Sequence, residues 1–283
     1  MAIKLDYAVP PGDLAPFVTL FYLFRSDAPV FEELERADHA QLRFRLSPGR
    51  ASYRFPTGGE RAAPPNHFLG ATRGATLTRV EGPVLLFGMG LTPCGWAGIL
   101  GLDASAAGSR LLDADAALGP AVARTAAALR EADDLAAMVS AVEPLLLERV
   151  ARSDREVAGF CRSVDAWLSG APSPALPDLL ARTGLTLRQA ERRCKHLYGA
   201  PPKVLARKHR ALRAATAIAS SDAASDVIVA EGFYDQSHLI RELKQFTGRT
   251  PGQIRANPGP LAELTVTRRR ALDGLVPPIV SRT

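Results

Sequence analysis

The chain has 283 residues, of which 47% are hydrophobic and 23% charged, and its formal net charge is +6. This composition excludes an intrinsically disordered protein, and the length is sufficient for two domains of ordinary size. No apolar run reaches the roughly 18 residues of a membrane span, and the first residues do not resemble a secretory signal. Three separated cysteines, Cys94, Cys161 and Cys194, form neither a disulfide framework nor a metal motif. We therefore expect a cytoplasmic protein with reduced thiols, no cofactor and no membrane partner.

The first 150 residues are expected to form strands and then helices. Short apolar or alternating runs separated by Pro and Gly predict strands near residues 17–24, 41–46, 76–80 and 84–89, with loops and short strands over 54–74. Apolar spacing predicts helices at 121–130 and 134–150. Asp133 or Asp134 is expected to cap the second helix, and Pro144 to kink or divide it. This order of elements predicts a small, cupin-like β-barrel with trailing helices.

The second half of the chain is expected to be helical. A short charged stretch at 151–155 predicts the linker between an N-terminal domain, residues 1–150, and an all-α domain, residues 156–256. The first helix of that domain should end at Gly170. The remaining residues, 257–283, contain several prolines and three consecutive arginines, and they predict a partly ordered tail. The predicted fold class of the whole chain is α+β.

The positive charge is confined to the second half. Residues 1–154 contain 15 Lys and Arg against 18 Asp and Glu, whereas residues 155–283 contain 20 against 11. Residues 176–213 alone carry ten basic and two acidic side chains. Such a concentration is typical of proteins that bind the phosphate backbone of nucleic acids. A solvated basic helical surface would have the same composition, so charge leaves both interpretations open.

A first helix-turn-helix unit is predicted around Gly184. A short apolar helix precedes this glycine, which can adopt the positive φ of a tight turn, and Thr186 is a suitable N-cap for a helix at 187–198. Leu187, Ala190, Cys194 and Leu197 are expected to pack inward. The outer face would then carry polar and basic side chains: Arg188, Gln189, Glu191, Arg192, Arg193 and Lys195. Arginines on such a face can bond guanine in a major groove.

A second unit is predicted around Gly232, preceded by the apolar residues Val227, Ile228 and Ala230. Phe233 should fill the core between the helices, and Asp235 should cap a helix at 236–247 that ends at Gly248. Its outer face would carry Gln236, Ser237, His238, Arg241 and Lys244. An amphipathic helix at 202–220 joins the two units and would set their separation.

The residues of the second unit resemble a known family. The string Gly232-Phe233-Tyr234-Asp235-Gln236-Ser237-His238-Leu239, followed by Arg241, Lys244, Gly248 and Thr250-Pro251, is similar to the signature of AraC/XylS-type transcription regulators. The stretch from Leu185 to Lys203 resembles the first unit of the same domain. The resemblance covers about residues 156–256 in register. Cys194 and Leu243 depart from it, because an aromatic residue is usual at both positions.

The resemblance implies a seven-helix domain whose third and sixth helices bind double-stranded DNA. The positions expected to contact DNA are Arg188, Gln189, Glu191, Arg192 and Lys195 in the first unit, and Gln236, Ser237, His238, Arg241 and Lys244 in the second. Glu191 would accept a hydrogen bond from cytosine or orient an arginine. The predicted function is a sequence-specific transcriptional regulator, not an enzyme.

The N-terminal half is expected to sense a small-molecule effector or to form a homodimer. Arg43, Arg45, Arg50 and Arg54 would line a pocket for an anionic effector or, as the alternative, a solvated strand face. The apolar face of the helices within 121–150 would serve dimerisation or pack on its own barrel. Two other functions remain as alternatives: a DNA-repair enzyme, which would need a reactive cysteine or a zinc site, and a protein-interaction module.

Overall fold

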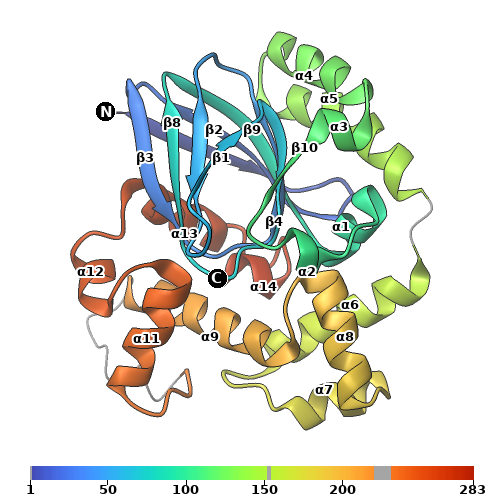
Figure 1. Ribbon diagram of the computed structural model, residues 1–283, viewed down its shortest axis with the longest axis vertical. Helices are drawn as coiled ribbons and strands as arrows, with labels where there is room; N and C mark the ends of the chain where they lie inside the picture. Colours follow the sequence, from blue (N-terminus) through green and yellow to red (C-terminus); the bar gives the residue numbers. More distant parts are fainter. Residues whose placement is uncertain (1, 152–153, 220–230) are drawn as a thin grey trace.

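Two antiparallel β-sheets form the N-terminal half of the computed structural model, which describes residues 2–151, 154–219 and 231–283 (Figure 1). The six-stranded sheet has the order β1 (Ile3–Ala8), β2 (Val18–Ser26), β9 (Val84–Leu91), β4 (Ala40–Arg45), β7 (Asn66–Leu69) and β10 (Leu111–Asp113). The four-stranded sheet has the order β3 (Val30–Glu35), β8 (Thr76–Glu81), β5 (Ala51–Arg54) and β6 (Glu60–Ala63). The strands predicted at 17–24, 41–46, 76–80 and 84–89 are thus present, with ends shifted by at most two residues.

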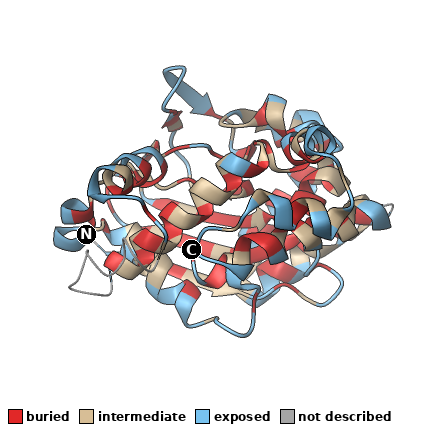
Figure 2. Cartoon of the chain, turned by 90° about the horizontal axis from the view of Figure 1, so that it is seen from below, coloured by how far each residue is buried: buried red, intermediate tan, exposed pale blue. Residues whose placement is uncertain are grey.

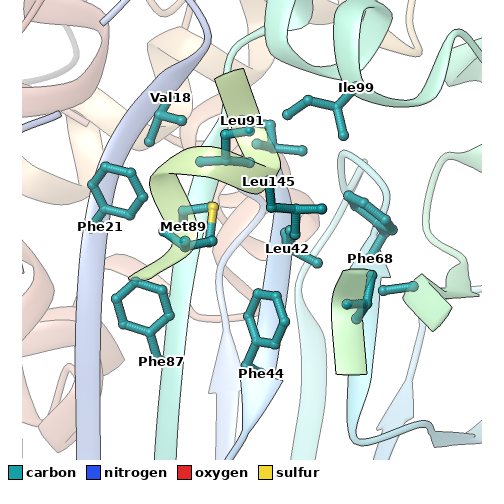
Figure 3. Packing of buried hydrophobic residues seen from close by; sticks show 14 of the residues in the cluster. Val18, Phe21, Leu42, Phe44, Phe68, Phe87, Met89, Leu91, Ile99 and Leu145 are labelled. Carbon is teal, nitrogen blue, oxygen red and sulfur yellow. The ribbon is translucent and has the colours of Figure 1, made fainter. Parts of the chain in front are cut away.

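The six-stranded sheet is buried on both faces. One face packs against the four-stranded sheet through a cluster that includes Phe24, Leu86, Phe31 and Val80. The other face packs against helices, and Figure 3 shows the aromatic side chains of β2, β4, β7 and β9 gathered on that side. All six residues of β4 are buried as a result. The sequence could not show this, because a strand covered on both sides does not alternate between apolar and polar residues.

Five helices follow the strands and cover the outer face of the six-stranded sheet. They are α1 (Pro93–Leu100), α2 (Ala104–Ala107), α3 (Ala114–Leu118), α4 (Ala121–Glu131) and α5 (Leu135–Val150). Asp134 caps α5, and Pro144 lies inside this helix without dividing it. Met138, Val142 and Leu145 of α5 belong to the same buried cluster as the strands. The apolar face that the sequence offered for dimerisation is therefore covered by this chain's own six-stranded sheet.

The C-terminal domain is helical, as predicted. Its described helices are α6 (Arg155–Gly170), α7 (Leu176–Thr183), α8 (Leu187–Tyr198), α9 (Pro202–Ile218), α11 (Gln236–Thr247) and α12 (Pro251–Ala256). One apolar cluster joins α6, α7 and α8, and a second joins α9, α11 and α12. The predicted helical residues Val227, Ile228 and Ala230 lie outside the described residues. Buried positions follow the inward faces of the described helices (Figure 2).

The segment after α12 is folded, which corrects the prediction of a partly ordered tail. It forms α13 (Pro260–Arg270) and α14 (Pro278–Ser281) and returns to the β-sheets, where α13 lies against β1 and β3 (Figure 1). Arg269, Val276 and Val280 are buried there. Two of the four prolines that suggested disorder, Pro260 and Pro278, stand at the first positions of these helices, where a missing N–H is tolerated. Within the described part of the chain, no helix is long and apolar enough to span a membrane.

Candidate nucleic-acid interface

The first helix-turn-helix unit consists of α7 and α8. Gly184 ends α7 with a φ of 66°, a left-handed conformation that glycine adopts without steric cost. Thr186 then caps α8 in a reciprocal arrangement with Gln189, whose side chain accepts from the Thr186 N–H at 2.9 Å. Ala190, Cys194 and Leu197 are buried as predicted, but Leu187, at the first position of α8, is exposed, because the first turn of the helix extends beyond the packed core. The turn and the cap therefore fix the direction in which α8 leaves the domain.

The outer face of α8 is open to solvent. Arg188, Gln189, Arg192 and Lys195 are exposed, and Glu191 is half-buried. Arg193 differs from its neighbours, because its guanidinium lies 4.9 Å from the centre of the Phe160 ring and pairs with Glu156 at 2.7 Å. The basic residues of α8 thus fall into two groups. Arg188, Arg192 and Lys195 are exposed, whereas Arg193 holds α8 on α6.

Gly232, Phe233 and Asp235 form the turn of the second unit that leads into α11. Gly232 has a φ of 69°, Phe233 is buried, and the Asp235 side chain accepts from the His238 N–H at 2.6 Å. Leu239, Leu243 and Phe246 are fully buried along one side of α11. The opposite side exposes Gln236, Ser237, Arg241 and Lys244. The two departures from the family pattern, Cys194 and Leu243, are both completely buried, so smaller residues fill these positions without exposing the core.

His238 lies differently from the other predicted contact residues. Its ring meets Phe233 edge to face, with the ring centres 5.4 Å apart, and its Nδ1 accepts from the Tyr234 N–H at 3.3 Å. Its Nε2 is 3.5 Å from Arg210. A DNA contact by His238 therefore stays a prediction, whereas the structure gives its ring a place in the packing of the turn.

Sequence reasoning missed a buried carboxylate that ties α11 to α9. Glu242 accepts from Arg207 through both of its oxygens, at 2.7 to 3.1 Å, while only 5% of its side chain is exposed. Arg210 lies 3.9 Å away on the next turn of α9. Bidentate pairs of this kind fix both distance and orientation. The only signal in the sequence is an acidic residue among the basic and polar residues of the helix, which by itself would indicate a solvated position.

Helix α9 packs against both α8 of the first unit and α11 of the second. In Figure 1 it runs between α8 and α11, which lie at its two ends. It is continuous over 17 residues, so its axis spans roughly 25 Å at about 1.5 Å per residue. Both α8 and α11 keep their polar faces away from α9. This arrangement can place two exposed helices side by side against one long, straight ligand.

Both units also contact the N-terminal half. The Lys208 ammonium donates to the main-chain oxygens of Asp38 and Thr72, at 2.6 and 3.1 Å. The Ala37 N–H donates to the Phe246 carbonyl at 2.7 Å. At the other end of α9, Gly199 packs against the main-chain oxygen of Ala104 in α2. The loop after β3 thus lies directly beneath the second unit.

A buried acid on α6, which packs against the first unit, gives a pH-dependent stability. Desolvation raises the pKa of Asp165 on α6 to about 6, although its side chain accepts from the Tyr198 hydroxyl at 2.9 Å. Because the pKa is raised on folding, protonation favours the folded state, and this contribution is lost as the pH rises through about 6. Asp165→Asn should therefore gain stability relative to the parent chain by about 2 kcal/mol between pH 4 and pH 7. Urea unfolding at a series of pH values measures this difference, and a constant difference would contradict the assignment.

The comparison with protein families agrees with this geometry. Residues 179–257 match the model of a helix-turn-helix domain family. The matched range includes α8, α9, α11 and α12 and most of α7. The C-terminal domain accordingly contains a helix-turn-helix DNA-binding domain of the AraC/XylS type over residues 179–257. The comparison with curated proteins finds no match.

Proposed function

We propose that this protein is a sequence-specific transcriptional regulator whose helices α8 and α11 enter successive major grooves on one face of the DNA. The observation that carries the proposal is the pair of exposed polar helix faces at the two ends of α9. Successive major grooves lie roughly 34 Å apart, which is of the same order as the span of α9. We assign residues 156–256 to DNA binding and residues 1–150 to regulation.

The two units are proposed to contribute differently. On α8, Arg188 and Arg192 would read guanine bidentately, Lys195 would contact phosphate, and Gln189 and Glu191 would contribute to base selection. On α11, Gln236, Ser237 and Arg241 would read bases and Lys244 would contact phosphate. The less charged α11 would thus add specificity more than affinity. We propose His238 as a residue that orients the start of α11, on the basis of its contacts with Phe233 and Tyr234.

The N-terminal half is proposed to respond to a small-molecule effector. A cavity of about 100 Å³ lies between the two sheets, and its walls come from both sheets and from α13. Contacts of Ala37 and Lys208 connect its margin to the DNA-binding domain. The DNA-repair alternative gains no support, because all three cysteines are buried and a thiol that accepts an alkyl group from DNA must reach it.

The test varies the number of base pairs between the two half-sites, which sets the face of the DNA on which each half-site lies. Duplexes are selected from a random pool with the full chain, and 5 or 10 base pairs are then inserted between the two protected elements. An insertion of 5 base pairs turns the second element to the opposite face, so the affinity should fall at least about tenfold. An insertion of 10 base pairs returns the second element to the original face but moves it further from the first. Because α9 is rigid and cannot span the added distance, this insertion should restore little of the affinity. Selected sites with a single element, or equal affinity for all three spacings, would contradict the proposal.

A further inference from the structure

Two cysteines meet where the N-terminal half contacts the C-terminal domain. Cys94 lies at the start of α1, and Cys161 lies on α6. The two helices pack against each other, and both residues belong to the apolar cluster that joins α6, α7 and α8. The thiols of Cys94 and Cys161 share a side-chain hydrogen bond. Helices from the two halves of the chain thus bring together the sulfurs of two cysteines that are distant in the sequence.

The two thiols differ in reactivity. Cys94 is the second residue of α1, where the positive end of the helix dipole favours a thiolate. The hydrogen bond from Cys161 lowers the pKa of Cys94, although burial acts in the opposite direction. The same hydrogen bond, together with burial, raises the pKa of Cys161. Cys94 is therefore the nucleophile of the pair, and Cys161 is the thiol placed to react with it afterwards.

Burial of the pair excludes a large reactant but leaves room for a small one. Cys94 is 7% exposed and Cys161 4%. A cavity of about 60 Å³ is lined by Thr92, Pro93 and Tyr198. Thr92 and Pro93 directly precede Cys94, and the Tyr198 hydroxyl donates to the main-chain oxygen of Cys161 at 3.1 Å. A molecule of the size of water or hydrogen peroxide therefore fits beside the residues that hold the two thiols.

We propose that Cys94 and Cys161 form a reversible disulfide with hydrogen peroxide as the oxidant, and that this bond fastens α6, with the first helix-turn-helix unit, to α1. The Cys94 thiolate attacks one peroxide oxygen and becomes a sulfenic acid, while the O–O bond breaks and hydroxide leaves and is protonated to water. The Cys161 sulfur then attacks the Cys94 sulfur. The S–S bond forms, the S–O bond breaks, and a second water leaves with the proton of Cys161. Both electrons that reduce the peroxide come from the two sulfurs.

The bond would couple the redox state of this site to the connection between the two halves. It closes a long loop that contains α2, α3, α4 and α5, and a long loop loses much of its freedom in the unfolded chain when it is closed. The oxidised chain should therefore unfold at a Tm at least about 4 °C above that of the reduced chain. The inference is independent of the DNA sequence that α8 and α11 recognise.

The test identifies the linked cysteines by mass spectrometry. The reduced full chain is treated with hydrogen peroxide, its remaining thiols are blocked with N-ethylmaleimide in urea, and it is digested with trypsin without reductant. Each cysteine falls in a different tryptic peptide, residues 80–110, 156–162 and 194–195. We expect the first two peptides to appear as one linked species, lighter than their sum by two hydrogen atoms, and to separate after dithiothreitol. Thermal unfolding of the same samples gives the change in Tm.

Cys194 provides the matched control. It is completely buried, and burial raises its pKa to about 12. Cys194→Ser should keep both the link and the gain in Tm, whereas Cys94→Ser should lose both. If Cys94→Ser fails to fold, the peptides of the parent chain still decide the question, because they identify the partners directly. The proposal is overturned if the folded parent chain gives no linked species, if peptide 194–195 is linked instead, or if the link leaves Tm unchanged.

Discussion

Replacing Arg188 or Arg192 by alanine is expected to weaken binding to the preferred duplex by about 1–3 kcal/mol each and to relax selection at particular base pairs. Both side chains are exposed on α8 and free to reach base edges. The loss should be smaller on a random duplex, because that complex depends on phosphate contacts rather than base contacts. Fluorescence anisotropy titrations on the preferred and random duplexes, at one fixed salt concentration, measure both effects.

Two control arginines make this experiment specific. Arg124→Ala removes an exposed arginine from α4, in the N-terminal half, and should leave DNA affinity unchanged. Arg193→Ala removes an arginine from the same helix as the proposed contacts, but one that packs on Phe160 and pairs with Glu156. It should reduce stability without changing base preference. An equal loss of affinity for all duplexes in the Arg188 and Arg192 variants would reduce their role to nonspecific attraction.

Arg207→Met is expected to destabilise the C-terminal domain by roughly 3–5 kcal/mol, because it leaves the Glu242 carboxylate buried without its bidentate partner. Arg210 and His238 lie 3.9 Å from Glu242, beyond hydrogen-bond distance, so they do not supply the two short hydrogen bonds that Arg207 donates. Glu242 joins α11 to α9, so the loss should also lower affinity for two-element sites more than for single-element sites. Urea unfolding followed by circular dichroism gives the free energy of unfolding.

The reverse substitution separates a buried charge from a lost contact. Glu242→Gln removes the charge and leaves Arg207, whose side chain is 34% exposed, able to reach water. It should therefore cost less than Arg207→Met. Arg207→Met combined with Glu242→Leu should recover part of the stability, since neither charge remains. The single variants Arg207→Met and Glu242→Leu each lose some free energy of unfolding. If the double variant loses as much as the sum of these two losses, the pair does not act as a unit.

The helix-turn-helix units were predictable because their signals are local. Gly184 and Gly232 adopt the left-handed conformation at the two turns, and Thr186 and Asp235 cap the helices that follow. Each of these features depends on a few adjacent residues, so the sequence specifies it without knowledge of the rest of the fold. The apolar spacing along α8 and α11 likewise predicted most of the buried residues, although Leu187 at the start of α8 is exposed.

The arginines of the N-terminal half show that local sequence signals do not predict which charged residues are buried. Arg43, Arg45, Arg50 and Arg54 resembled one strand face, yet the first two are buried and the last two are exposed. Arg43 lies among Glu35, Tyr53 and Gln41, which come from three strands. Burial of an arginine depends on partners that the sheet topology brings together, and the neighbouring residues in the sequence do not indicate which partners these are.

By itself, the sequence determined the α+β class, the positions of the two turns, the basic character of the C-terminal domain and most of the polar residues exposed on α8 and α11. Only the tertiary structure decided that residues 257–283 return to the β-sheets, that Glu242 fixes α11 on α9, and that Arg269 of α13 pairs with Asp38. The physical reason is the range of the interactions. Turns, caps and helical faces depend on neighbours within a few residues, whereas a buried charge is stable only when distant parts of the chain supply its environment.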